Sequence, residues 1–421
     1  MSKFFKENFI LLGIVLGVIV GGVIGSILPG LGVKLGFLGE LFLNALKMIV
    51  LPLIIVSITL SIIQLGNARN FGSVGMKTIF YYTITTAVAV FIGIVVVLTI
   101  NPGEGGGAFA GALPENVKAK EGFSFIDLLL SLFPPNIISA ANEFKILPLV
   151  VASVLFGVAF SKLGGEGRVI EELFSAVNKA IMKIVQWIIY FAPIGIMGLI
   201  SYRIGIAGGG EAVADLVVQL GKYSISVVAG LLIHGLIILP VILFVFTRRN
   251  PFIYVSQLSK ALLTAFGTAS SSATLPITMK CTEEDAGVSP KITRFVLPMG
   301  ATVNMDGTAL YEAVAVIFIA QSYGIALSPT ELIAVFLTAT LAAIGAAGIP
   351  EAGLITMVLV LQAVGLPIEG IGLILAIDWF LDRFRTTVNV WGDAVGSAVI
   401  EKWEGGGEGE QTLTQFQAQV G

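Results

Sequence analysis

The last apolar stretch of the chain carries a concentrated set of polar side chains. Asp378, Asp382, Arg385, Asn389 and Asp393 follow one another at intervals of four, three, four and four residues. On an α-helix this spacing places all five side chains on one face, because residues three or four apart are neighbours on a helix surface. A charge at bilayer depth costs at least about 2.5 kcal/mol, so several charges persist together only when they pair or bind something.

Two hypotheses explain this polar stripe. One is a structural ion-pair ladder, with pairs such as Asp378–Arg383 or Asp382–Arg385. The other is a binding site for a small zwitterion with an extra carboxylate, because an arginine binds a carboxylate bidentately and a neighbouring aspartate accepts an ammonium group. We favour the binding site, since ion pairing alone does not explain the asparagine and Thr386 on the same face.

A second polar element, "NMDGT", occupies residues 304–308. Its glycine can unwind a helix and free backbone carbonyls, and Asn304 and Asp306 add side-chain oxygens. Oxygen ligands without His or Cys suit a hard cation such as sodium. A kinked helix with a solvated aspartate is the alternative. Asp393, in "NVWGD", is a matching carboxylate for another cation.

Two further titratable residues lie among apolar neighbours. Glu312 follows Thr308 by four residues, so it faces the same region if the helix resumes after Gly307, and a carboxylate buried there could carry a proton. His234, within "LLIHGLIILP", is the one histidine of the chain. We expect it to be a core histidine with satisfied hydrogen bonds.

The whole composition requires a membrane. Of 421 residues, 56% are hydrophobic and 12% are charged, against roughly 25% charged in soluble chains. Roughly 20 apolar residues suffice to cross a bilayer as a helix. Most of the long charge-free stretches are therefore candidate spans. These stretches cover residues 8–33, 48–68, 78–103, 184–202, 223–247, 261–279, 313–330 and 332–350.

The charges between these stretches predict the orientation of the chain. We expect the first stretch to be a retained helix, since no small-residue cleavage site follows it. Basic residues cluster at Lys3/Lys6, Arg248/Arg249 and Lys291/Arg294, which predicts a cytoplasmic amino terminus. The single cysteine, Cys281, excludes an intrachain disulfide and a thiolate metal cluster.

Two segments in the second half are poor straight helices. Residues 266–279, "FGTASSSATLPITM", and residues 342–357, "AAIGAAGIPEAGLITM", are interrupted by small residues and proline. Broken segments at membrane depth must be buried in protein or line a watery cavity. Interrupted segments at matching places in two halves indicate a transporter binding site at an inverted-repeat interface. Two glycine-rich helix kinks are the simpler alternative.

Four motifs together carry a family resemblance. The stretches "SSSATLPITM", "NMDGTALYEAVAVIFIAQ", "IGAAGIPEAG" and "DWFLDRFRTTVNV" closely resemble the sodium-coupled glutamate transporters, formally the dicarboxylate/amino acid:cation symporters. The likeness covers essentially the whole chain and is nearer to the animal excitatory amino acid transporters than to archaeal members. It implies a transporter and not an enzyme.

The resemblance implies a fold and an assembly. We expect an all-α polytopic membrane protein with eight transmembrane helices, two re-entrant helical hairpins centred on residues 270–276 and 345–353, and inverted repeats. We also expect a homotrimer in the cell (plasma or inner) membrane with both termini cytoplasmic, and no nucleic-acid partner. An elevator mechanism would carry the site across the bilayer. The implied parts are scaffold helices 1–2 (1–75), transport-domain helix 3 with an external loop (76–123), scaffold helices 4–5 (124–212), the remaining transport domain (213–402) and a flexible tail (403–421).

The resemblance also implies roles for individual residues. Arg385 would hold the substrate side-chain carboxylate and Asp382 its amino group. The remaining implied pocket residues are Ser271, Thr308, Ile349, Thr386 and Asn389. The implied sodium ligands are Gly300, Asn304, Asn389 and Asp393 at one site, Tyr82, Thr85, Thr86, Asn304 and Asp306 at a second, and the backbone of Thr302, Ala343, Ile344 and Ala346 at a third.

Coupling to other ions is a further implication. Glu312 matches the animal position implicated in proton coupling with potassium countertransport, which makes protons and potassium expected coupled ions. Ala269 stands where archaeal members have an arginine, and Arg383 appears in the last helix, as in the animal proteins. Glu351 stands where animal members usually have glutamine, so the electrostatics of the second hairpin differ.

The substrate class follows from two residues. Neutral amino acid members replace the arginine, and C4-dicarboxylate members have no ammonium for Asp382 to bind, so we predict sodium-driven uptake of acidic amino acids, L-glutamate and L-aspartate. An ATP-driven pump is disfavoured because no phosphate-binding G-x-x-x-x-G-K-[S/T] loop exists. An anion channel would not explain the carboxylate-rich oxygen sites. An intramembrane aspartyl protease could use Asp306 and Asp382, but Arg385 beside them opposes the acid role.

Overall fold

The computed structural model describes residues 9–69, 73–103, 130, 132–143, 146–206, 208–209, 211–344, 346 and 352–405. Helices dominate these residues, and no strand occurs among them. The helices of the first half are α2 (Phe9–Ile27), α3 (Pro29–Arg69), α4 (Ser73–Ile100), α6 (Ile137–Asn142), α7 (Ile146–Ser161), α8 (Gly165–Ile189) and α9 (Ala192–Ile206). Those of the second half are α10 (Glu211–Ile233), η3 (His234–Ile238), α11 (Leu239–Thr247), α12 (Pro251–Gln257), α13 (Ser259–Thr268), α14 (Ser271–Lys280), η4 (Cys281–Asp285), α15 (Pro290–Val303), α16 (Asp306–Ser322), α17 (Pro329–Ile344), α18 (Ala352–Ala363), η5 (Ile368–Gly370) and α19 (Ile371–Trp403).

Several of these helices are long and apolar enough to cross a membrane. Within the described residues there are four such helices, Pro29–Gln64, Ser73–Ile100, Leu216–Thr247 and Pro290–Ser322. A fifth span arises if α8 and α9, which are bent by 54° at their junction, count as one broken span. The all-helical architecture with several apolar helices is that of a polytopic membrane protein, as the composition predicted.

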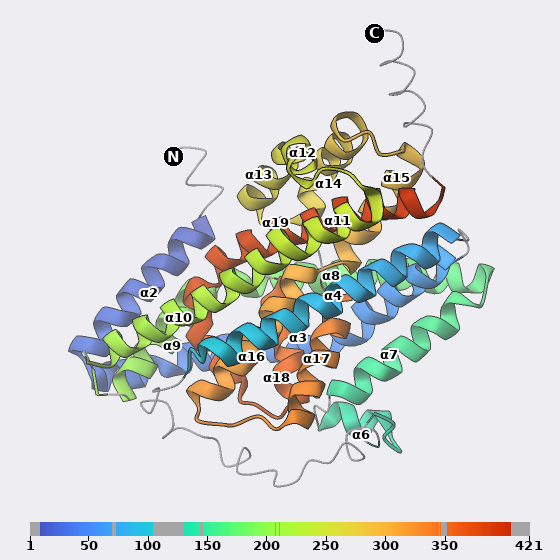
Figure 1. Cartoon of the computed structure of the whole chain (residues 1–421). Helices are drawn as coiled ribbons and strands as arrows, with labels where there is room; N and C mark the ends of the chain where they lie inside the picture. The colour runs from blue at the N-terminus through green and yellow to red at the C-terminus, as the bar shows by residue number, and fades with distance from the viewer. Residues whose placement is uncertain are drawn as a thin grey trace.

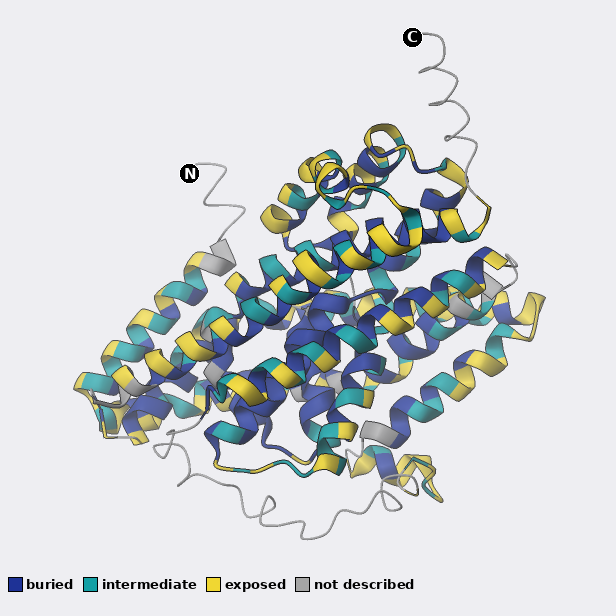
Figure 2. Ribbon diagram, in the orientation of Figure 1, coloured by how far each residue is buried: buried dark blue, intermediate teal, exposed yellow. Residues whose placement is uncertain are grey.

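The helices form two packed groups. α2, α3, α7, α8 and α9 pack mainly on one another, whereas α16 packs between α4, α10, α17, α18 and α19. Every side chain of α16 except that of Gln321 is buried, and Figure 2 shows this helix in dark blue at the centre. By contrast, α2 and α10 alternate between buried and exposed positions. The second group therefore surrounds a buried helix that begins at the "NMDGT" motif.

The first interrupted segment folds as two antiparallel helices. α13 ends at Ala269, whose φ of +49° lies in the left-handed region. Ser270 then caps α14, since its hydroxyl accepts a hydrogen bond from the Ala273 backbone N–H. α13 and α14 pack against each other and on α19. A tight reversal thus occurs at the small, hydroxyl-rich residues that the sequence singled out.

The second interrupted segment has the same build. α17 and α18 pack against each other and on α16, but residues 345 and 347–351 between them, including Ile349 and Glu351, lie outside the described residues. The two helix pairs occupy opposite ends of the second group: α13 and α14 lie at the top of the view, and α17 and α18 lie in its lower part (Figure 1).

The two pairs also differ in what covers them. α17 and α18 pack on α3 and α7 of the first group. The other pair packs on α15 and α19 and leaves Leu263, Phe266 and Ile277 exposed. In the described residues, the α17–α18 pair therefore contacts the first group, whereas the α13–α14 pair packs within the second group.

Candidate functional site

The polar stripe lies on one continuous helix, α19. Arg385 is completely buried and forms ion pairs with two carboxylates of its own helix. Its Nη1 lies 2.9 Å from Asp378 Oδ1, and its Nη2 lies 2.8 Å from Asp382 Oδ1. The guanidinium carbon lies 3.8 Å from the centre of the Tyr311 ring. Asp378 and Asp382 share a face with Arg385 because they precede it by two turns and one turn.

This arrangement resolves the pairing hypotheses. The Asp382–Arg385 pair is confirmed, whereas the Asp378–Arg383 pair is wrong, because Asp378 binds Arg385. Arg383 donates instead to the backbone carbonyls of Phe266 and Gly267 near the end of α13, at 3.0 and 2.9 Å. It therefore ties the first hairpin to α19 and takes no part in the carboxylate cluster.

Two neighbours complete the surroundings of Arg385. Asn389 donates from Nδ2 to Thr308 Oγ1 at 3.1 Å and accepts at Oδ1 from the Gly307 backbone N–H at 2.7 Å. Gly353 of α18 passes close by, since a Cβ built on it would lie 3.0 Å from Arg385 Nη1 and 3.2 Å from Thr308 Cγ2. The site is thus enclosed by α16, α18 and α19, three elements far apart in the sequence.

The remaining expected pocket residues lie as follows. Thr386 is buried on α19 beside Arg385, and Ser271 is buried at the first position of α14. Ile349 lies outside the described residues. Arg385 Nε has no hydrogen-bond partner within the described structure. A buried donor of this kind is available to a ligand.

A second polar cluster surrounds the break between α15 and α16. Asn304 follows the last residue of α15 in a non-helical conformation, with φ −97° and ψ 81°. Its Nδ2 donates to Asp393 Oδ1 at 3.0 Å, and its Oδ1 accepts from the Thr85 hydroxyl at 3.3 Å. Thr85 comes from α4 and Asp393 from α19. The interruption of the helix thus brings side-chain oxygens from three helices together.

Asp306 occupies the other side of this break. Its Oδ1 accepts from the Thr86 hydroxyl at 2.8 Å, and its Oδ2 lies 3.0 Å from His234 Nε2. Both Asp306 and His234 are completely buried. The expectation of a buried core histidine is therefore confirmed, with Nε2 hydrogen-bonded and Nδ1 without a partner within the described structure, and the hydrogen-bond partner is one of the predicted sodium ligands. The two residues are 72 positions apart in the sequence, so sequence spacing could not predict this contact. The only available signal was that His234 is the single histidine of the chain.

The backbone around His234 explains its position. Residues 234–238 form a π-helical turn, η3, just before Pro240 of α11. A proline within a helix lacks the N–H and crowds the carbonyl four residues back, which favours a local widening. The Gly235 carbonyl accepts a hydrogen bond from Trp391 Nε1 at 2.9 Å. Trp391 therefore fixes η3 against α19 beside the Asp306 cluster.

Gly300 lies where no side chain fits. A Cβ at this position would come within 2.3 Å of Asp393 Oδ1 and 2.5 Å of the Tyr82 hydroxyl oxygen. The backbone of α15 therefore approaches the Asp393 carboxylate closely at this position. Tyr82 itself donates to the Val296 carbonyl at 2.7 Å.

The residues expected at a third cation site are less closely gathered. Thr302 donates from its hydroxyl to the Met299 carbonyl at 3.2 Å. Ala343 and Ala346 are buried at the end of α17 and just beyond it. Ile344 lines a small cavity between α4, α15 and α17, together with Tyr82 and other residues. The same cavity is lined by the hydroxyl-bearing side chains of Tyr82, Thr83, Thr86 and Thr340.

Glu312 lies on α16, one turn beyond Thr308. It is completely buried, accepts a hydrogen bond at Oε1 from the Thr356 hydroxyl of α18, and has no partner at Oε2 within the described structure. The carboxyl group therefore joins α16 to α18.

No group of three or more His, Cys, Asp or Glu residues that could hold a metal ion occurs in the described part of the chain. The clusters instead combine one or two carboxylates with hydroxyl, amide and backbone oxygens. This donor set suits a weakly held hard cation that must be released again.

Most of the chain is similar in sequence to known membrane transporters. A profile described as the sodium:dicarboxylate symporter family matches residues 9–403. Excitatory amino acid transporter 1 of Ambystoma tigrinum is 41% identical over 424 residues, covering 87% of this chain and 76% of the relative. An excitatory amino acid transporter of Caenorhabditis elegans is 42% identical, with 87% and 80% covered. Human excitatory amino acid transporter 2 is 40% identical, with 88% and 74% covered.

Proposed function

The chain belongs to the sodium:dicarboxylate symporter family, and we propose that it takes up L-glutamate and L-aspartate, driven by the sodium gradient. It is a membrane transporter and not an enzyme. The names of its relatives, excitatory amino acid transporters, support the acidic amino acid class.

The observation that carries the proposal is the buried Arg385 between two carboxylates. A guanidinium at this depth needs an anionic partner, because an unpaired buried charge is strongly unfavourable. The side-chain carboxylate of the substrate would replace one of the internal partners, and the released Asp382 would accept the α-ammonium group. A neutral amino acid supplies no carboxylate for Arg385, and a C4-dicarboxylate supplies no ammonium for Asp382.

Sodium would bind at the two oxygen clusters beside this pocket. One comprises Gly300, Asn304, Asn389 and Asp393, and the other comprises Tyr82, Thr85, Thr86, Asn304 and Asp306. We assign a third site to the backbone of Thr302, Ala343, Ile344 and Ala346. Asn389 contacts Thr308 and Gly307, so sodium binding at the first cluster would order the substrate pocket directly.

We further propose that protons and potassium are coupled ions. Glu312, hydrogen-bonded to Thr356 of the second hairpin, would carry the proton, and its free Oε2 gives that proton a position. Arg383, bound to the carbonyls near the end of α13, would link the first hairpin to the same cycle.

The architecture proposed is that of the family. Eight transmembrane helices and two re-entrant hairpins, α13–α14 and α17–α18, would form inverted repeats in a homotrimer. Both termini would lie in the cytoplasm, and the protein in the cell membrane. α2, α3 and α6–α9 would form the static scaffold, while α4 and α10–α19 would move as a transport domain.

The test is uptake of labelled L-glutamate and L-aspartate into proteoliposomes under an inward sodium gradient, with and without internal potassium. Sodium-driven uptake stimulated by internal potassium is expected. Sodium-driven uptake indifferent to potassium would refute the potassium and Glu312 assignment. Absence of acidic uptake would refute the substrate class.

A further inference from the structure

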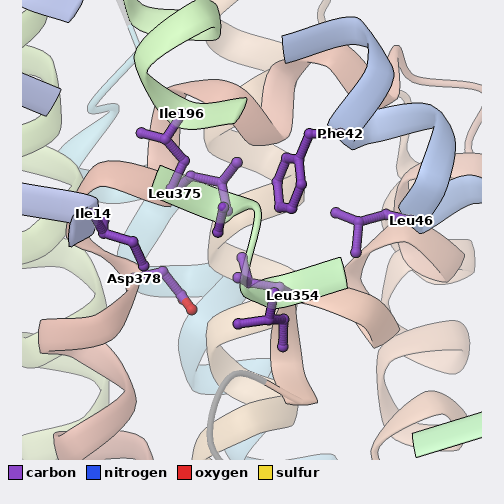
Figure 3. A pocket seen from close by; sticks show the side chains of 9 residues that line it. Ile14, Phe42, Leu46, Ile196, Leu354, Leu375 and Asp378 are labelled. Atoms are coloured by element: carbon purple, nitrogen blue, oxygen red, sulfur yellow. The ribbon is translucent and has the colours of Figure 1, made fainter. Parts of the chain in front are cut away.

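The transport motion must occur across the contact between the first helix group and the second. One part of this contact is an apolar pocket between the groups (Figure 3). Its lining includes Ile14, Leu46 and Ile196 of the first group and Leu354 and Leu375 of the second. Aliphatic contacts of this kind are non-directional, so they do not by themselves hold the groups at one relative position.

A directional contact joins the same groups elsewhere. Arg203, in the last turn of α9, is 5% exposed, and Tyr323, which follows α16, is 2% exposed. Arg203 Nη2 donates a hydrogen bond to the Tyr323 hydroxyl oxygen, and the guanidinium carbon lies 5.5 Å from the ring centre. Hydrogen bonds to charged groups are stronger and more directional than apolar contacts.

Tyr323 is rigidly connected to the binding site. Its backbone N–H bonds to the carbonyls of Ile319 and Ala320 at the end of α16. The beginning of the same helix carries Asp306 and Thr308. Displacement of the site along the scaffold therefore moves Tyr323 relative to Arg203, and a shift of a few ångströms exceeds the reach of a hydrogen bond.

We propose that Arg203 and Tyr323 form a latch that stabilises the conformation in which α18 packs against α3. Arg203 is thus a positioning residue for the transport step and does not touch the substrate. The inference rests on the proposed elevator motion. Removing the Tyr323 hydroxyl eliminates a hydrogen bond to a charged group, for which we expect about a tenfold loss in the ratio of this conformation to the alternative one.

Cross-linking measures this ratio. Leu46 of α3 and Leu354 of α18 line the same pocket (Figure 3), so cysteines at these positions should cross-link only in this conformation. In the full chain carrying Cys281→Ala, Leu46→Cys and Leu354→Cys, we would measure the cross-linking rate in proteoliposomes with a short bifunctional thiol reagent. Tyr323→Phe is expected to slow it. Tyr190→Phe, the same change at an exposed tyrosine of the scaffold, should leave it at the parental rate.

Arg203→Gln is a second variant and should slow cross-linking as Tyr323→Phe does. The double variant should cross-link no more slowly than either single variant, because both substitutions remove the same hydrogen bond. A parental cross-linking rate in folded Tyr323→Phe protein would overturn the latch, as would equal slowing by Tyr190→Phe. Because cross-linking requires no substrate, failure of sodium-driven uptake would refute the proposed function and leave this measurement of the latch intact.

Discussion

Replacement of Arg385 by cysteine tests the substrate assignment most directly. The guanidinium makes three contacts with two carboxylates, at 2.9 and 3.3 Å to Asp378 and 2.8 Å to Asp382. A bidentate contact with a substrate carboxylate would be of the same kind. At about 1.5–3 kcal/mol for each hydrogen bond to a charged group, two lost bonds predict a loss of roughly 10²–10⁴ in affinity for L-glutamate.

The same substitution has a structural cost. Removal of one partner from a buried ion pair typically destabilises a protein by about 3–5 kcal/mol, because the other charge is left uncompensated. Arg385→Cys leaves Asp378 in that position, since both of its carboxylate oxygens lie against the guanidinium. The double variant Arg385→Cys/Asp378→Asn removes the stranded charge. It should recover stability without recovering glutamate uptake.

The assay is competition in proteoliposomes between labelled L-glutamate and labelled L-serine or L-cysteine under a sodium gradient. Arg385→Cys should lose glutamate uptake and gain uptake of neutral amino acids, with sodium dependence retained. Arg383→Cys, the same change two residues earlier on the helix, should keep the preference for acidic substrates. Glutamate uptake with a KM within a few-fold of the parental value in Arg385→Cys would refute the assignment.

Three other substitutions have defined outcomes. Glu312→Gln should abolish the pH and potassium dependence of net uptake, and a variant still driven by a potassium gradient would contradict this role. Gly300→Ala places a Cβ 2.3 Å from Asp393 Oδ1, so the sodium concentration for half-maximal uptake should rise by about tenfold or more. Gly22→Ala is the control, because a Cβ at Gly22 has no other atom within 4 Å. His234→Phe removes the contact with Asp306 and should also raise the sodium concentration for half-maximal uptake. An unchanged value would contradict a role of this contact in sodium binding.

Local patterns predicted the elements of the site well. The stripe from Asp378 to Asp393 could be placed on one helical face because helix periodicity depends only on spacing. The break at Asn304 and the reversal at Ala269 were indicated by glycine and by small hydroxyl residues. Both features depend on neighbours in the sequence, and the structure shows both.

Contacts between distant elements could not be predicted in the same way. Spacing alone offered Arg385 carboxylate partners three and seven residues earlier, and it did not indicate that the guanidinium binds both at once. The His234–Asp306 contact requires a π-helical turn in one helix and a break in another. The sequence of the turn does not indicate that Asp306 lies opposite His234, and the sequence around the break does not indicate that His234 lies opposite Asp306.

The burial of α16, complete except at Gln321, has a consequence for how the protein is made. Among the four spans found in the described residues, Pro290–Ser322 is the least apolar and the one whose apolar window lies entirely inside the protein. It includes Asp306 and Glu312, whose insertion into lipid as isolated charges is costly. Insertion of this segment into the bilayer as a solitary helix therefore costs more free energy than insertion of the other three spans. The segment must be released from the insertion machinery together with its neighbours, so substitutions that weaken its packing against α4 should first appear as topological errors during biosynthesis.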